Sequence, residues 1–201
     1  YFQAFGRFVD QLHGAYLTCE DSGTSTKDMD IVRTVTPHVL GTSSGSGDPS
    51  PFTALGCRRG IEAVAEVILK RENLKGLHVA LQGVGAVGGH LARELHEAGA
   101  RLTIADVDAE RVARVAHETG AAVATVDTIF DVECDIFAPC ALGGAINLAT
   151  LPRLRCRAVA GAANNQLESA AIGVELSRRG IFYAPDYAIN AGGLINVAQE
   201  V

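Results

Sequence analysis

The segment that decides the fold is residues 78–106, HVALQGVGAVGGHLARELHEAGARLTIAD. Its hydrophobic pattern predicts a buried strand over 78–82, a helix over 86–98 and a second strand over 101–105. Between the first strand and the helix, the sequence GVGAVG fits the pattern G-x-G-x-x-G. There the first glycine allows a tight turn, the second lets backbone approach a pyrophosphate, and the third packs helix against strand. The segment predicts a dinucleotide-binding unit whose cofactor-binding residues are Gly83, Gly85, Ala86, Val87 and Gly88.

Asp106 follows the second predicted strand, at the separation from the glycine turn expected for an acid that binds the adenosine ribose. A carboxylate there accepts hydrogen bonds from the ribose hydroxyls and repels a 2′-phosphate, and no basic residue adjoins it in the sequence. We therefore expect NAD rather than NADP, bound by Asp106 and its neighbour Val107. The alternative is that Asp106 only caps the turn of residues 107–109.

Predicted strands and helices alternate outside this unit as well. Further strands are expected over 136–138, 157–160 and 181–183, and further helices over 52–70, 109–119 and 167–179. Parallel neighbours in a sheet need a helix-length connection between them. The alternation therefore predicts an α/β fold: a Rossmann-type, doubly wound and mostly parallel sheet with right-handed crossovers.

The N-terminal part of the chain has a different pattern. Apolar residues at helical spacing over 2–12 are followed by a short predicted strand over 15–18 and a second helix over 28–35. Residues 41–51 are Gly, Ser, Asp and Pro almost throughout, which predicts a loop and a hinge. We expect a cleft to open and close about this loop.

The composition limits the classes of protein to consider. With 201 residues, 48% hydrophobic and 20% charged, the chain is expected to form a soluble globular protein. A net charge of -6 offers no basic surface for nucleic acid, and no apolar run approaches the roughly 20 residues that cross a bilayer. No signal-peptide pattern is seen, so a cytoplasmic location is expected. The cysteines and histidines are dispersed without zinc-ligand spacing, which predicts reduced thiols and no metal.

Four segments resemble one family of enzymes. They are GDPSPFTA at 47–54, VECDIFAPCALG at 132–143, AGAANNQL at 160–167 and YAPDYAINAGG at 183–193. In the same order, they are similar to segments of the leucine, valine and phenylalanine dehydrogenases, a family related to glutamate dehydrogenase. The resemblance covers essentially the whole chain. It implies an NAD-dependent enzyme that oxidatively deaminates an apolar L-amino acid, of the branched-chain type, to its 2-oxo acid and ammonia.

The resemblance also implies a domain organisation and roles for individual residues. Residues 1–50 would be a remnant of an N-terminal catalytic domain with the hinge, residues 51–201 the NAD-binding domain, and the full-length protein a homo-oligomer. Within the segment LTCEDSGT, Asp21 matches the general acid/base that exchanges protons with the substrate amine, and Glu20 is the adjacent competitor. The residues matched to positions around the nicotinamide ribose, the carboxamide or the substrate are Thr53, Asn164 and Asn190, and those in a turn beside the cofactor are Cys140 and Ala141. We assign Cys140 a position there and no nucleophilic chemistry.

The residues that the same resemblance places against the substrate side chain are Cys19, Leu40, Leu194 and Val197. Since none is charged, this lining would leave the γ-carboxylate of glutamate buried without a partner, which disfavours glutamate. Because Leu194 is bulky where a smaller residue would leave room for a ring, we expect leucine, valine or isoleucine. Structural interpretations of the matched residues stay open. Asp21 could cap the helix that begins near Ser25, Asn164 could be a turn former, and Leu194 and Val197 could be core residues.

The sequence departs from the family in one respect. Members carry two lysines in a glycine-rich segment, one binding the substrate carboxylate and one promoting attack of water, and neither has a counterpart here. We therefore expect a chain truncated at both ends that binds NAD but turns over no amino acid alone. The rival functions are a non-catalytic NAD-binding module and a hydroxy-acid dehydrogenase. The latter is disfavoured because no histidine follows His117.

Overall fold

The computed structural model describes residues 1–21 and 23–201. Contacts divide the chain into two compact units, unit 1 with Tyr1–Phe52 and Gly192–Val201, and unit 2 with Thr53–Ala191. The first division lies close to the boundary expected at residue 50, whereas the C-terminal segment groups with unit 1. Hydrogen bonds within unit 1 account for this grouping, because the Glu200 carboxylate accepts from the backbone N–H groups of Gly41 at 3.1 Å and Ser46 at 2.6 Å.

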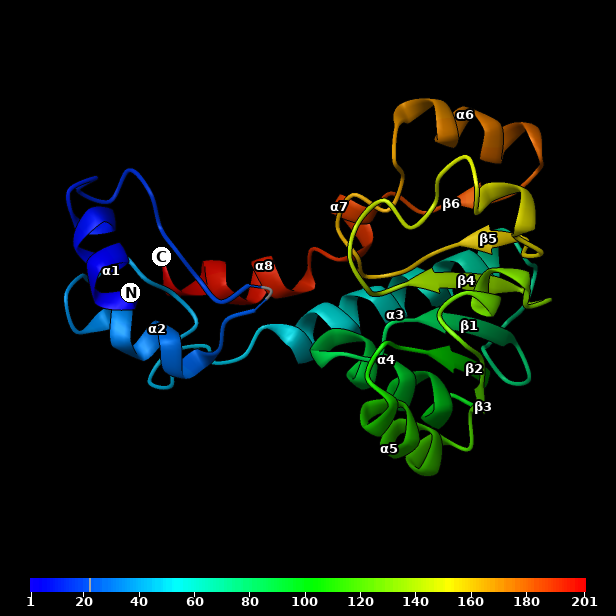
Figure 1. Cartoon of the computed structure of the whole chain (residues 1–201), viewed down its shortest axis with the longest axis horizontal. Helices are drawn as coiled ribbons and strands as arrows, with labels where there is room; N and C mark the ends of the chain where they lie inside the picture. The colour runs from blue at the N-terminus through cyan, green and yellow to red at the C-terminus, as the bar shows by residue number, and fades with distance from the viewer. Residues whose placement is uncertain (22) are drawn as a thin grey trace. The chain divides into compact units, whose positions relative to one another are not determined.

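Unit 2 is built on a six-stranded sheet in the order β3-β2-β1-β4-β5-β6, and all neighbouring strands are parallel (Figure 1). The strands are β1 His78–Gln82, β2 Arg101–Ala105, β3 Ala122–Val123, β4 Ile136–Pro139, β5 Ala158–Val159 and β6 Phe182–Tyr183. The chain runs outward from β1 to β3 and then returns to β4 beside β1, where the direction of winding reverses. This order confirms the predicted Rossmann-type, doubly wound fold.

The core of unit 2 lies on both faces of the sheet. Successive residues of a strand point to opposite faces. Accordingly Val79 and Leu81 of β1 join a core cluster that contains residues of α3, α4 and α5, whereas Ala80 joins a second cluster with residues of η1 and α6. In β4, Ile136 and Phe137 separate in the same way. Burial on both faces explains why residues 79–81 of β1 and 136–138 of β4 are consecutive apolar residues rather than alternating with polar ones.

The helical elements of this part of the chain are α3 Ser50–Val67, α4 Ala86–Glu97, α5 Ala109–Thr119, η1 Thr128–Asp131, η2 Leu151–Arg153, α6 Ala170–Arg178 and α7 Asp186–Ile189. The helices predicted over 86–98 and 109–119 are confirmed. The one predicted over 167–179 begins later, because Leu167 forms a bridge with Ile146 and Ser169 is the N-cap residue of α6. Strand β3 was not predicted, since two exposed residues carry no periodic pattern.

Unit 1 contains α1 Phe2–Asp10, α2 Thr26–Arg33, α8 Gly192–Val197 and η3 Ala198–Glu200. Met29, Val32 and Val39 form its small buried cluster, against which Phe2 and Phe5 pack. In the part of the chain that the structure describes, no helix is long and apolar enough to cross a membrane.

The strand expected over 15–18 is wrong. Within it only Thr18 pairs, as an isolated bridge in which its N–H donates to His38 O at 3.1 Å and its carbonyl accepts from Leu40 N at 2.8 Å. Gly14 before it has φ 84°, and Tyr16 is exposed. One isolated bridge does not make a ladder. Because the segment has no partner strand among the described residues, its β-strand propensity did not produce a strand.

Candidate dinucleotide site

The glycine turn after β1 packs directly against the turn after β4. Gly83 has φ 96°, in the left-handed region, and a Cβ added to it would lie 2.7 Å from Ala141 N. The backbone N–H of Cys140 also donates to Gln82 O at 2.7 Å. A side chain at position 83 would therefore be both strained and in collision. The structure thus brings Cys140 and Ala141 beside the glycine turn, and their expected position beside the cofactor stays a prediction.

The other two glycines of the turn occupy different surroundings. A Cβ on Gly88 would come within 2.1 Å of Gly83 O, so the first turn of α4 lies too close to the end of β1 for any side chain. A Cβ on Gly85 would have Arg111 Nη1, at 3.8 Å, as its only neighbour within 4 Å. Gly85 is the N-cap residue of α4 and supplies no side-chain cap. Apart from the Arg111 guanidinium, no side chain crowds Gly85 at the positive end of the helix dipole, and the absence of a Cβ lets a pyrophosphate approach the backbone N–H groups there.

Asp106 lies at the end of β2 with its side chain only 7% exposed. Its Oδ2 accepts a hydrogen bond from Val84 N at 2.8 Å, and its Oδ1 accepts one from Asp108 N at 3.0 Å. The second bond is the turn-capping role given above as the alternative. The first bond reaches into the glycine turn, so the same carboxylate also borders the candidate cofactor site.

A basic residue lies beside Asp106 in space, although none adjoins it in the sequence. Arg111 Nη1 is 3.4 Å from Asp106 Oδ1, and Arg111 Nη2 is 3.4 Å from Asp108 Oδ2. The absence of a basic neighbour in the sequence, which was one reason to expect NAD rather than NADP, therefore does not hold in space. Arg111 is one turn into α5, and its spacing of three residues from Asp108 indicates an ion pair with Asp108 but not the approach to Asp106.

Asn164 and Asn190 are brought together by the fold of unit 2. Asn190 Nδ2 donates to Asn164 Oδ1 at 2.5 Å and to Ala162 O at 3.2 Å. Asn190 ends α7 as its C-cap residue, and Asn164 is exposed in the turn after β5. Thr53 lies near the start of α3 and is half-buried.

Gln166, which the sequence analysis did not single out, holds the turn that carries Asn164. It is fully buried, and its Nε2 donates to Gly161 O at 2.7 Å and to Ala163 O at 3.0 Å. The turn is therefore fixed from inside by a side-chain amide, while Asn164 stays on the surface. Buried polar side chains are nearly always hydrogen-bonded to specific partners. Gln166 is such a residue, and the sequence analysis did not recognise it.

The thiol of Cys140 is chemically quiet. Burial raises the pKa of Cys140 to about 12, against a smaller opposing effect of a backbone hydrogen bond from Ala162. Only the thiolate is a nucleophile, and its population at neutral pH is negligible under these conditions. The raised pKa agrees with assigning no nucleophilic chemistry to Cys140.

Asp21 lies in unit 1, in a turn with Thr24. Thr24 N donates to Asp21 O at 2.9 Å, and Asp21 N donates to Thr24 Oγ1 at 2.9 Å. The N-cap residue of α2 is Ser25, paired with Asp28 in a capping box, so the alternative in which Asp21 caps this helix does not describe the structure. Asp21 is exposed.

Glu20, the neighbouring carboxylate, is engaged within unit 1. Its Oε2 accepts a hydrogen bond from Thr26 Oγ1 at 2.8 Å. Burial raises the pKa of Glu20, and the charges of Asp48 and Asp28 act in the same direction, against the hydrogen bond from Thr26. Thr26 thus orients the Glu20 side chain toward the start of α2.

All four residues assigned to the substrate side chain belong to unit 1. Val197 is 2% exposed, with its Cγ1 3.8 Å from where a Cβ on Gly41 would lie, whereas Leu194 is 69% exposed. Cys19 and Leu40 are half-buried, and burial, followed by the charges of Asp21 and Glu20, raises the pKa of Cys19. The alternative interpretation, that these are core residues, therefore fits Val197 better than Leu194.

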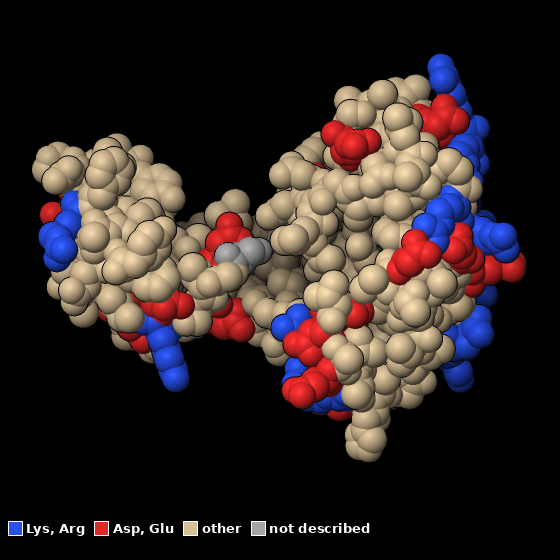
Figure 2. All heavy atoms as spheres, viewed as in Figure 1, with Lys and Arg blue, Asp and Glu red and all other residues tan. Residues whose placement is uncertain are grey.

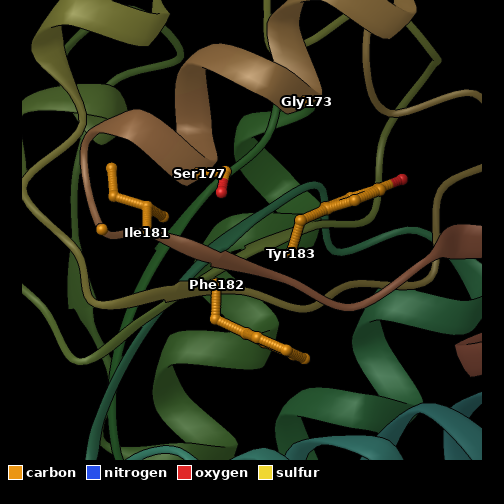
Figure 3. Close-up of a pocket in the computed structure, with 6 residues that line it drawn as sticks. Gly173, Ser177, Ile181, Phe182 and Tyr183 are labelled. Carbon is orange, nitrogen blue, oxygen red and sulfur yellow. The ribbon is translucent and has the colours of Figure 1, made fainter.

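A separate cavity of about 440 Å³ lies between α6 and β6 (Figure 3). It is lined by Gly173, Ser177, Gly180, Ile181, Phe182 and Tyr183. None of these is a candidate cofactor or catalytic residue.

On the face shown in Figure 2, basic and acidic side chains are interspersed, in keeping with ion pairs such as Arg153–Asp131 at 2.7 Å.

The fold and the glycine turn define unit 2 as a Rossmann-type α/β domain with a dinucleotide-binding geometry. The chain belongs to the Glutamate/Leucine/Phenylalanine/Valine dehydrogenase family, whose family model matches residues 104–201. This confirms the resemblance derived from the sequence segments.

The chain is similar over its whole length to named members of that family. It is 51% identical to a leucine dehydrogenase of Geobacillus stearothermophilus, covering 100% of this chain and 55% of the relative. It is 45% identical to a valine dehydrogenase of Streptomyces virginiae, covering 98% and 57%. The crystal structure of L-tryptophan dehydrogenase from Nostoc punctiforme superposes with a TM-score of 0.82 at 42% identity, covering 99% and 57%. The chain thus spans about half the length of the relatives it matches, and their names do not favour a non-catalytic module.

Proposed function

We propose that unit 2 binds NAD and that the protein to which this chain belongs oxidatively deaminates an apolar L-amino acid of the branched-chain type. The observation that carries the cofactor proposal is the glycine turn, in which a Cβ on Gly88 would collide with Gly83 while a Cβ on Gly85 would meet Arg111 Nη1 at 3.8 Å. Several leucine dehydrogenases are among the relatives, the first of them 51% identical, which supports the reaction and the substrate class.

The residues of unit 2 would each hold one part of the cofactor. The N–H groups at the start of α4 would bind the pyrophosphate, and Asp106 with Val107 the adenosine ribose. Asn164 and Asn190, which already form a hydrogen bond with each other, would orient the nicotinamide end beside Cys140 and Ala141. Thr53 would support the same end. The bound cofactor supplies the hydride acceptor, and the protein supplies its orientation.

The residues of unit 1 would act on the substrate. Asp21 would take a proton from the substrate amine and return one to the departing ammonia, as a general acid/base. Cys19, Leu40, Leu194 and Val197 would surround the substrate side chain without offering a charge to glutamate. We further propose a homo-oligomer for the full-length protein, and a cytoplasmic location in line with its free thiols.

Two measurements test this proposal. Calorimetric titration of NAD into the chain should show saturable binding, and the absence of binding would overturn the cofactor assignment. With the full-length protein, absorbance at 340 nm should rise with leucine, valine or isoleucine and not with glutamate. A protein that binds NAD but oxidises no amino acid would instead be the non-catalytic module.

The role of Asp21 needs its own pair of variants in the full-length protein. Asp21→Asn should lower turnover by about 100-fold or more while NAD affinity stays unchanged, because it removes only the proton-transfer group. Asp10→Asn, an exposed carboxylate in α1, makes the same charge change and should leave turnover unaltered. Equal activity of the two variants would show that Asp21 is not the acid/base.

A further inference from the structure

The guanidinium of Arg111 lies next to Gly85 of the glycine turn and next to Asp106, the carboxylate that defines the proposed ribose position. Its Nη1 is 3.4 Å from Asp106 Oδ1 and 3.8 Å from where a Cβ on Gly85 would lie. Its backbone N–H donates to Asp108 Oδ1 at 3.0 Å, which fixes the start of α5 beneath it. A positive group is thereby held between the glycine turn and Asp106.

The contacts of this guanidinium are long enough to be exchanged. Both of its ion pairs, to Asp106 and to Asp108, measure 3.4 Å, and its side chain is 37% exposed. Ion pairs of this length at a half-exposed position contribute little. By contrast, the Asp106 carboxylate is nearly buried and holds two backbone N–H groups at 3.0 Å or less. The carboxylate is therefore fixed, and the guanidinium can reorient toward a ligand.

These opposite charges act oppositely on a phosphate at the ribose 2′ position. Asp106 accepts hydrogen bonds from a free 2′-hydroxyl and repels a 2′-phosphate. A guanidinium presents a planar fork of donors that matches phosphate oxygens in a bidentate manner. Since Arg111 lies within contact distance of Asp106, a 2′-phosphate near this carboxylate would also be within reach of the guanidinium.

We propose that Arg111 is a specificity-determining residue that lets the site accept a 2′-phosphorylated dinucleotide, so that the chain binds both NAD and NADP with NAD preferred. This rests on the proposed binding of NAD in unit 2. The preference for NAD follows from Asp106, and the tolerance of NADP from Arg111. With Arg111 present, the preference for NAD over NADP is therefore smaller than Asp106 alone would give.

The test compares the binding of NAD and NADP to the 201-residue chain by calorimetry, in the wild type and in three variants. Arg111→Ala should weaken NADP binding by about 10-fold and change NAD binding by less than about 3-fold. Arg111→Lys keeps the charge without the fork and should fall between the wild type and Arg111→Ala. Arg101→Ala is the matched control: it removes one positive charge from the other end of β2 and should change neither affinity.

The outcomes separate this inference from the proposed function. If the wild type binds neither dinucleotide, the proposed binding of NAD fails first. If the wild type binds NAD but Arg111→Ala weakens NAD and NADP by the same factor, Arg111 supports the site without selecting, and the inference is overturned. It is also overturned if the wild type binds NAD and shows no measurable affinity for NADP. The adenosine fragments 5′-AMP and 2′,5′-ADP, used as competitors, should reproduce the NAD and NADP pattern, and equal competition by both fragments would contradict the inference.

Discussion

The carboxylate of Asp106 accepts a hydrogen bond from the backbone N–H of Val84, with Oδ2 and N separated by 2.8 Å. This bond ties the end of β2 to the middle of the glycine turn after β1. One side chain therefore fixes the turn, and in the proposed function it would also line the ribose position. Cofactor binding and the stability of the turn are expected to respond together when it is changed.

Asp106→Asn should lower NAD affinity by about 10-fold and the free energy of unfolding by about 1–2 kcal/mol. The amide can replace only one of the two carboxylate oxygens as acceptor, so either Val84 N or Asp108 N loses its partner. Calorimetry and urea unfolding measure the two effects. Glu110→Gln, which removes a charge from an exposed position in α5, should change neither quantity. An Asp106→Asn protein with unaltered NAD affinity would contradict the ribose assignment.

Gly88→Ala should abolish measurable NAD binding, because its Cβ would lie 2.1 Å from Gly83 O and force α4 away from β1. The expected loss of stability is about 1–3 kcal/mol or more. Gly89→Ala is the control, since its Cβ would meet Val84 O at 3.4 Å and alanine favours the helix by up to about 1 kcal/mol. Thermal unfolding and NAD titration distinguish them, and similar behaviour of the two variants would exclude this packing argument.

Gln166→Glu should destabilise unit 2 more at pH 8 than at pH 5. Burial raises the pKa of the introduced carboxyl, and only its protonated form can donate to Gly161 O or Ala163 O. Stability is therefore lost as pH rises through that pKa. Gln166→Leu leaves both carbonyls without this donor at every pH and should cost about 1–3 kcal/mol throughout. Urea unfolding at the two pH values is the measurement, and a pH-independent loss for Gln166→Glu would refute the assigned donor role.

Alkylation of Cys140 by iodoacetamide at pH 8 should be at least about 100-fold slower in the folded chain than in guanidinium. Burial raises its pKa to about 12 from an ordinary value of 9.0, so the thiolate fraction falls steeply on folding. Peptide mass spectrometry after timed labelling gives the rates. Rapid labelling of Cys140 in the folded protein would show that the thiol is accessible and ionised. Cys140→Ala should still bind NAD, as expected of a residue without nucleophilic chemistry.

The amino-acid sequence by itself determined the class of fold and the glycine turn at which we propose the dinucleotide site. Strand and helix periodicities are local properties, and the central strands are buried on both faces, so residues 78–106 could be interpreted without knowing their neighbours. The glycine turn could also be predicted from the sequence, because each glycine satisfies a local steric requirement. Short elements could not be predicted in this way. Strand β3, for example, has only two residues, and both are exposed.

Tertiary structure alone decided which distant side chains meet. The hydrogen bond between Asn190 and Asn164 joins residues 26 positions apart, and the one between Gly41 N and Glu200 joins residues 159 positions apart. Arg111 reaches Asp106 because β2 and α5 are joined by a tight turn, which no periodicity records. Patterns in sequence encode which face of an element is buried, whereas packing of whole elements sets the distances between polar groups. For this reason the sequence predicted an acid at the ribose position, and only the fold placed a guanidinium beside it.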